Sequence, residues 1–323
     1  MKTGRLQVTI YNRSILKELH GSQNDRYQRA GAGAACTLLR LGCIEKQIVT
    51  ISSIGYARKN LGKLGIIAAS NAITVQGGEP LGAFLQLWLP ENYTERKLKL
   101  LVRQAKETAD SLGMDIFDVQ VQIQPDANRP LLTVTGIGKE VTEFEGLKPG
   151  QDVIVMGNLA IEGTAVLAVE QEEVLKERFQ DSFIQRAKDT LEEICMVQEA
   201  AAAIKSGVSM LKEAGEGGIF GALWEFAEDS GVGLEIDLRK LPVRQETIEV
   251  CEALHRNPYE LVSRGCLLAG CDNGNDTIKQ LAEAGITAVY IGKVTEGNDR
   301  IIWNEDEKRY LEPGKDDEIY HVK

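Results

Sequence analysis

The chain has 323 residues, of which 43% are hydrophobic and 26% are charged, and its formal net charge is −11. This composition is typical of a globular protein of about two domains, and it excludes collagen-like, coiled-coil and disordered chains. The overall acidity argues against a nucleic-acid or anionic-membrane partner, and no apolar run reaches the roughly 18 residues that a membrane span needs. Because the first residues lack the apolar segment of a secretory signal, we expect a cytoplasmic protein.

The charge is unevenly distributed along the chain. Residues 1–147 carry 18 Lys and Arg against 14 Asp and Glu, whereas residues 148–323 carry 19 against 34. The first half is therefore short of carboxylates, which are the side chains that hard divalent cations prefer.

The first half predicts a four- or five-stranded sheet with helices on one face. Alternating or β-branched segments predict strands at residues 6–10, 47–51, 83–89, 119–124 and 131–136. An amphipathic helix is expected to start after Thr94 as N-cap and to end at Gly113, because apolar residues recur at helical spacing between them. A second helix is expected from Gly62 to Val75.

A turn signal at residues 148–152 predicts the boundary between two domains, 1–147 and 148–323. In the second domain, strands are expected at residues 153–157, 233–237, 266–270 and 287–294, with a hairpin over 301–303 and 309–311. Helices are expected as one or two long segments over 172–205, and as shorter ones at 245–255 and 276–284; a further helix is expected to be opened by residues 215–218 and closed by Ser230-Gly231. Two such mixtures indicate an α+β fold with two domains rather than one dinucleotide-binding sheet.

The cysteines and histidines do not predict a metal site. The six cysteines form no C-x-x-C pair, and the three histidines lie apart from them, so the clustered spacing of a zinc site is missing from the sequence. We expect reduced thiols, several of them buried, and His255 as a helix-capping or surface group.

Three glycine-rich segments are candidates for anion binding: Gly31-Ala32-Gly33, Gly77-Gly78 and Gly215-Glu216-Gly217-Gly218. The third opens a predicted helix, where main-chain N–H groups and the helix dipole favour a phosphate. The alternative is that these glycines only allow tight turns and close packing. Beside the third segment, Glu213 and Glu216 could hold a cation, or they could form a solvated acidic loop.

Several of these segments carry a family resemblance when taken together. In the second half they are Gly150–Gly157, Glu162–Ala165, Glu216–Ile219, Glu225–Gly233, Gly265–Leu268 and Gly285–Val294; in the first half they are Arg13–Lys17, Gly77–Pro80, Asn128–Pro130 and Thr135–Gly138. Jointly they resemble the aminoimidazole ribonucleotide (AIR) synthase superfamily, and most closely its branch of hydrogenase-maturation carbamoyl dehydratases. The resemblance covers essentially the whole chain.

The resemblance implies two α+β domains per chain and a homodimer whose N-terminal sheets join across the interface. It also implies a reaction, because active members bind Mg-ATP between the domains and phosphorylate an amide-type oxygen. Phosphoryl transfer needs cations that neutralise the triphosphate, and those cations need carboxylate ligands. In the family the N-terminal domain supplies them.

This sequence departs from the family pattern at those acidic positions. By the resemblance, the family's acids correspond to Ala34 and Ala35, Ser52 and Ala72, and its His-Thr-Glu strand motif corresponds to Gln120-Val121-Gln122. The catalytic positions are therefore degenerate, no metal ligands are assigned, and ATP and Mg²⁺ are cofactors of the family rather than a prediction for this chain. The remaining candidates for contacts to a nucleotide or another phosphorylated ligand are Gly31, Gly33, Lys63, Asn71, Glu213, Glu216, Gly217 and Gly218.

Two functions follow from these observations, and the sequence leaves open whether the chain is an enzyme. The first is a catalytically degenerate homodimer with weak or lost Mg-ATP binding, which acts as a binding or regulatory protein or as the partner of an active paralogue or another protein. The alternative is an active ATP-dependent ligase or dehydratase that uses other residues, such as Glu79, Glu213 and Glu216. A third option is the binding of another phosphorylated or purine-like molecule without turnover.

Overall fold

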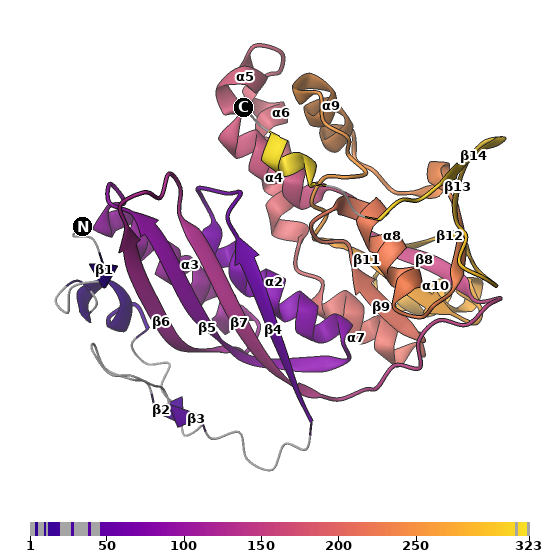
Figure 1. The fold of residues 1–323 in the computed structure, drawn as a ribbon, viewed down its shortest axis with the longest axis horizontal. Helices are drawn as coiled ribbons and strands as arrows, with labels where there is room; N and C mark the ends of the chain where they lie inside the picture. Colours follow the sequence, from indigo (N-terminus) through magenta and orange to yellow (C-terminus); the bar gives the residue numbers. More distant parts are fainter. Residues whose placement is uncertain are drawn as a thin grey trace. The chain divides into compact units, whose positions relative to one another are not determined.

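The computed structural model describes residues 4–5, 10, 12–19, 27–28, 38–39, 46–313 and 316–321. The chain divides into two compact units, Met1–Val141 and Thr142–Lys323, shown in indigo to magenta and in magenta to yellow in Figure 1. The division lies six residues before the boundary expected from the sequence, at the start of a stretch without helix or strand at residues 141–148.

The first unit contains a five-stranded sheet with the strand order β1-β6-β5-β7-β4. The strands are β1 (Gly4–Arg5), β4 (Gln47–Ile54), β5 (Gly78–Pro90), β6 (Asp115–Gln124) and β7 (Leu131–Glu140). The helices are α2 (Leu61–Val75), α3 (Glu95–Ser111) and the short η1 (Asn12–Leu16), and β2 (Tyr27–Gln28) pairs with β3 (Leu38–Leu39). Strands β5 and β6 run parallel, because α3 provides the crossover between them.

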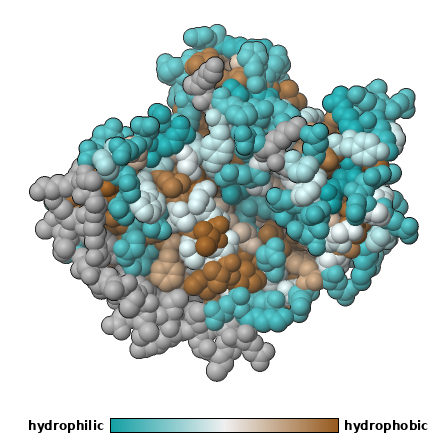
Figure 2. Space-filling view, in the orientation of Figure 1, coloured by the Kyte–Doolittle hydropathy of each residue, from teal (hydrophilic) through white to brown (hydrophobic). Residues whose placement is uncertain are grey.

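Helices α2 and α3 pack against one face of this sheet, as the sequence predicts (Figure 1). Thr94 caps α3 by accepting a hydrogen bond from the Lys97 N–H, and the apolar residues at helical spacing are buried. The opposite face of the sheet carries side chains that are open to solvent, with Val49 60% and Ile51 71% exposed on β4. Apolar side chains gather near β4 and β7, at one edge of this sheet, in Figure 2.

One predicted strand cannot be compared with the structure, and another begins earlier than predicted. The predicted strand at residues 6–10 lies almost entirely outside the described residues. Strand β5 begins at Gly78, five residues before the predicted start at Ala83, and its pairing is irregular between Pro80 and Gly82. The start of β5 was not predicted because it contains Pro80, and a proline usually argues against a strand. Prolines are tolerated within strands mainly where the pairing is irregular, as it is here.

The second unit contains a seven-stranded sheet with the order β14-β13-β10-β12-β8-β11-β9. Its strands are β8 (Asp152–Gly157), β9 (Met210–Glu213), β10 (Gly233–Asp237), β11 (Cys266–Cys271), β12 (Ala288–Thr295), β13 (Arg300–Asn304) and β14 (Glu307–Tyr310). Its helices are α4 (Ile161–Glu170), α5 (Glu172–Lys176), α6 (Asp181–Asp189), η2 (Thr190–Glu193), α7 (Val197–Lys205), α8 (Gly218–Glu228), η3 (Leu238–Lys240), α9 (Gln245–Leu254), α10 (Gly274–Glu283) and η4 (Glu318–His321).

The prediction of one or two long helices over residues 172–205 was wrong, because the structure has several short helices there. The segment is divided into α5, α6, η2 and α7, and α4 and β9 were not predicted at all. The sequence also predicts an apolar stripe of Ile194, Val197, Ala201 and Ile204, of which Ile194 is buried and the other three are half-buried, whereas Ala200 and Ala203 of α7 are buried. Tertiary packing of short helices, rather than one continuous amphipathic face, therefore determines this region. Within the residues that the structure describes, every helix is too short or too polar for a transmembrane segment.

Replacing Gly62 by Ala is expected to lower the free energy of unfolding by about 2–3 kcal/mol, because the new Cβ overpacks the contact between α2 and α3. A Cβ at Gly62 would lie 2.1 Å from the main-chain oxygen of Leu101 and 2.8 Å from the nitrogen of Ala105. Urea denaturation followed by circular dichroism measures the effect. The matched control is Gly221→Ala in α8, where the nearest atom to a new Cβ is the Glu216 oxygen at 3.8 Å, so a gain in stability is expected there. If the Gly62→Ala chain has the same free energy of unfolding as the original chain, α2 and α3 are not packed as closely at Gly62 as described.

Candidate functional site

The glycine segment of the second unit opens α8, as the sequence predicts. Gly217 and Gly218 have φ angles of 83° and 65°, which L side chains rarely adopt. A Cβ at Gly218 would also lie 2.4 Å from the Tyr259 oxygen. The apolar residues predicted for the helix are buried, so this loop is held tightly on the second domain.

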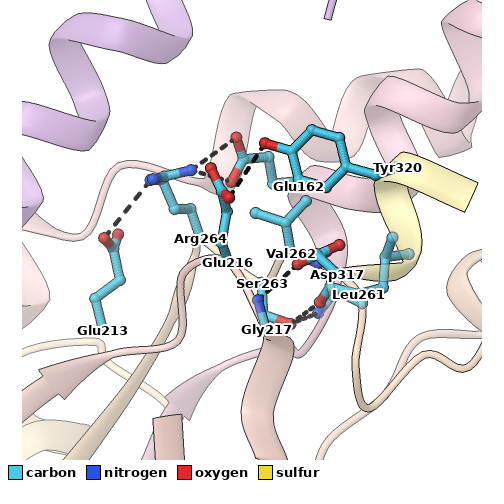
Figure 3. Close-up of polar contacts among 11 residues, drawn as sticks. Glu162, Glu213, Glu216, Gly217, Leu261, Val262, Ser263, Arg264, Asp317 and Tyr320 are labelled. Atoms are coloured by element: carbon cyan, nitrogen blue, oxygen red, sulfur yellow. Dashed lines mark hydrogen bonds and ion pairs between the residues drawn. The ribbon is translucent and has the colours of Figure 1, made fainter. Parts of the chain in front are cut away.

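The carboxylate of Asp317 closes this loop (Figure 3). Its Oδ2 accepts the main-chain N–H of Gly217 at 2.7 Å, and its Oδ1 accepts the N–H groups of Val262 at 3.2 Å and Ile319 at 2.8 Å. Asp317 is only 4% exposed. A position where main-chain donors could receive an external anion is thus filled by an anionic side chain of the same chain.

A buried ion pair lies beside the loop. The Nη1 atom of Arg264 lies 3.2 and 3.0 Å from the two carboxylate oxygens of Glu162 on α4, and Glu162 is fully buried. The Nε atom of Arg264 lies 3.8 Å from the Oε2 atom of Glu213, the last residue of β9 (Figure 3). Arg264 therefore joins two carboxylates from separate elements, and its charge is already engaged within the protein.

Glu216 adds a further carboxylate to this cluster. The hydroxyl of Tyr320 donates to its Oε2 atom at 3.2 Å (Figure 3). Burial raises the pKa of Glu216, and the neighbouring carboxylates of Asp317 and Glu162 raise it further, against the opposing charge of Arg264. Burial likewise raises the pKa of Asp317, although three main-chain N–H groups oppose the change. Burial and the nearby Glu216 raise the pKa of Tyr320 to about 12. We call Glu162, Glu213, Glu216, Arg264 and Asp317 the acidic cluster.

Replacing Glu216 by Gln is expected to stabilise the chain more at pH 7 than at pH 4. Because the folded-state pKa of Glu216 lies above its ordinary value, the folded chain binds more protons than the unfolded chain between these values. The unfolding free energy therefore falls as pH rises through that window, and a neutral Gln does not share this loss. Urea denaturation at both pH values measures the difference. Glu296→Gln, at an exposed position, is the control. The expectation is contradicted if Glu216→Gln changes the free energy of unfolding by the same amount at pH 4 and at pH 7.

The structure places the predicted site residues of the first unit on several elements. Ser52 lies half-buried on β4, Lys63 and Ala72 lie half-buried on α2, and Asn71 is buried on α2. Gln120 and Gln122 are exposed on β6, and the side-chain amide of Gln120 donates to Asp118 at 3.0 Å. Ser52 and Ala72 belong to elements that pack against each other. The candidates Gly31, Gly33, Ala34 and Ala35 lie outside the described residues.

The second unit brings its predicted residues together. Glu213, Glu216, Gly217 and Gly218 all lie at the acidic cluster or in the loop beside it. Glu79, named for the alternative function, is exposed on β5 and its carboxylate lies 2.6 Å from the Lys139 Nζ atom.

Four residues of this site were missed by sequence reasoning: Glu162, Arg264, Asp317 and Tyr320. Glu162 and Arg264 had a weak signal, since they are lone charges next to apolar or small residues, whereas Asp317 lies in a charged run that gave none. Their partners lie far away in sequence, and only the fold shows the pairing.

The remaining polar groups offer little for metal chemistry. In the described ranges, no group of three or more His, Cys, Asp or Glu side chains is arranged to hold a metal ion. The cysteines at 195, 251, 266 and 271 are free thiols and three of them are buried, as expected. Burial raises the pKa of Cys251 and of Cys266 to about 12. His255 ends α9 in the left-handed conformation, in agreement with a capping role.

The chain thus has an α+β fold of two domains, and a glycine loop opens helix α8 of the second domain. Residues 36–139 match the N-terminal domain of AIR synthase related proteins, and residues 148–304 match their C-terminal domain. The chain belongs to the AIR synthase-related protein family, as the motif resemblance predicts.

Its similar proteins include hydrogenase maturation proteins. A putative hydrogenase expression/formation protein of Methanocaldococcus jannaschii is 24% identical over 67% of this chain, and the carbamoyl dehydratase HypE of Cupriavidus necator is 25% identical over 68%. The matched regions cover 63% and 62% of those two relatives.

The fold is also similar to that of solved structures. The E. coli hydrogenase maturation protein HypE has a TM-score of 0.77 at 22% identity, covering 96% of this chain and 99% of HypE. A HypE structure in complex with ATP has a TM-score of 0.71 at 17% identity, covering 94% of this chain and 93% of HypE. A chain of a HypE–HypF complex has a TM-score of 0.63 at 22% identity, covering 82% of this chain and 90% of that chain.

Proposed function

We propose that this chain is a HypE-like family member that has lost Mg-ATP-dependent phosphoryl transfer and acts as a binding or regulatory protein. The observation that carries the proposal is the closed glycine loop. The Gly217 N–H, which would be available to a phosphate at the start of α8, donates instead to Asp317. The cytoplasmic location expected from the sequence stays a prediction.

The charge around the loop supports the proposal. A triphosphate carries several negative charges that cations must neutralise. Here the charge of Arg264 is shared by Glu162 and Glu213, while Glu216 and Asp317 add further carboxyl groups. At the reduced dielectric of a partly buried site, like charges at short range repel each other strongly. The acidic cluster therefore disfavours a phosphate beside this loop.

The first unit supports the proposal through side-chain chemistry. Mg²⁺ prefers carboxylate oxygens, and it is usually held by one or two of them together with substrate phosphates. At the positions that correspond to the family's acidic residues, Ser52, Ala72 and Gln122 carry no charge. Each lacks the charged oxygen that a metal ligand of this family would supply.

We also propose that the chain forms a homodimer through the open face of its first sheet. The neighbouring apolar side chains Val49 and Ile51, both exposed on β4, support this, because exposed apolar side chains that cluster on one face often mark a protein–protein interface. A further protein partner, such as an active paralogue, is consistent with the existence of a HypE–HypF complex.

The alternative function, an active ligase or dehydratase with unusual residues, is favoured by one observation. Glu216 is an exposed residue, but the pKa of its carboxyl group is raised beside the acidic cluster, which would suit a general acid or base, and groups with perturbed pKa values often mark catalytic sites.

A phosphate-release assay distinguishes the two functions. Purified chain is incubated with ATP and Mg²⁺, with and without acetamide as a small amide acceptor, beside an active HypE. The proposal predicts no phosphate above the buffer rate. Release by the original chain that falls at least about tenfold in the Glu216→Gln variant would overturn the proposal and support the alternative.

A further inference from the structure

A pocket of about 250 Å³ lies in the second unit, and Gly217, whose N–H donates to Asp317, is part of its lining. It is formed by the first turn of α8, by η3 and by the segment that follows β14. Leu238 and Ile302 contribute apolar side chains to its lining, and Phe220 and Tyr310 contribute aromatic ones. This volume is below the roughly 300–1,000 Å³ of pockets for drug-sized ligands, so it suits a ligand with a single ring.

A glycine within α8 leaves this pocket open. Gly221 lies in the helix interior, where glycine is less stable than alanine, and its φ is not positive. Packing does not explain it, since the nearest atom to an added Cβ is the Glu216 oxygen at 3.8 Å. Gly217 and Gly218 differ, because their positive φ angles require glycine. Gly221 is buried and yet borders empty space, which points to an occupant of the pocket.

The aromatic side chains are arranged to hold a flat ligand. The Phe220 ring stacks on Tyr259, with centroids 5.0 Å apart and planes 8° apart, so its orientation is fixed. The Tyr310 ring accepts a cation on one face, since the Lys308 Nζ atom lies 4.7 Å from its centroid. Tyr310 itself is 59% exposed, so the fixed part of the aromatic lining is Phe220, and a side chain that is already ordered lowers the entropy lost when a ligand binds.

Two of the three charged side chains that line the pocket are carboxylates, which favours a positive ligand. Glu260 and Glu312 both line it. The guanidinium of Arg309, which also lines it, already donates to both carboxylate oxygens of Glu307 at 3.1 and 3.0 Å. The second half of the chain has 34 acidic against 19 basic residues, so its field attracts cations.

We propose that this pocket binds a small planar ligand that carries an amine or amidine group. The ring lies among Phe220, Tyr310 and the surface left open by Gly221, and the cationic group is near Glu260. Gly217 belongs both to this pocket and to the closed loop, but the inference does not depend on whether the chain turns over ATP, because its test measures the binding of a cationic ring and not of a nucleotide.

Benzamidine is the probe, with benzoate as its anionic counterpart of the same shape. The full chain is titrated with each, and the methyl NMR signals of Leu238 and Ile302 are followed, with Ile291 of β12 as a reference away from the pocket. A ligand of this size is expected to bind with a Kd of about 1–10 mM, and benzoate at least about tenfold more weakly. Glu260→Gln is expected to weaken benzamidine binding several-fold, whereas Glu296→Gln leaves it unchanged.

Gly221→Leu fills the pocket and is expected to abolish the shifts of the two methyl signals. Gly221→Ala tests folding separately, since it is expected to raise the melting temperature while narrowing the pocket. The proposal is overturned if benzamidine leaves the Leu238 and Ile302 signals unchanged. It is also overturned if benzoate binds as tightly as benzamidine, or if a folded Gly221→Leu chain retains the original affinity.

Discussion

Replacing Arg264 by Met is expected to lower the free energy of unfolding by about 3–5 kcal/mol, because it leaves a buried charge without its cation. Glu162 is fully buried, and both of its oxygens lie within 3.2 Å of Arg264. Glu213 loses the same cation at 3.8 Å. Urea denaturation at pH 7 measures the loss.

Two further variants show whether this loss comes from the buried charge. Adding Glu162→Gln to Arg264→Met is expected to recover a large part of the stability, because the unpaired carboxylate is then gone. Arg309→Met removes an exposed pair with Glu307 and is expected to change stability by less than about 1 kcal/mol. An Arg264→Met effect as small as that of Arg309→Met would show that the ion pair does not hold the acidic cluster together.

Replacing Ile51 by Glu is expected to convert the proposed homodimer to a monomer at micromolar concentrations. Ile51 is 71% exposed on the open face of the first sheet. In a symmetric dimer the substitution acts twice, so two buried charges would weaken association by about a hundredfold or more.

Sedimentation equilibrium over a range of protein concentrations measures this association. Ile248→Glu is the matched control, because Ile248 is 45% exposed on α9 of the second unit. The proposal of a dimer through this face fails if the original chain is monomeric at all concentrations, or if the Ile51→Glu chain dimerises as tightly as the original.

Local signals predicted the fold well wherever the chain itself supplied them. Thr94 caps α3 and Gly113 follows its end with a positive φ, as expected from the sequence. The alternation of Val119–Gln124 predicted a strand with one buried face, which β6 confirms. Periodicity could not predict the breaks between α5, α6 and α7, because these helices pack against different elements: α5 and α6 against α4, and α7 against α10.

The candidate site was predictable only in its local part. The glycine loop and Glu216 stand together in sequence, so the spacing indicated them. Asp317 lies 100 residues from Gly217, and Arg264 lies 102 residues from Glu162. Side chains so far apart meet through the arrangement of strands and helices. Sequence reasoning therefore identified a loop suited to an anion but not the aspartate that fills it.

Titration of the purified chain with ATP in excess Mg²⁺, by isothermal calorimetry, tests the central claim most directly. HypE, which has been solved in complex with ATP, is the positive control. The proposed loss of the Mg-ATP site predicts no saturable heat up to about 1 mM ATP. A micromolar Kd that disappears when the Mg²⁺ is chelated, with a matching rise in melting temperature, would contradict it.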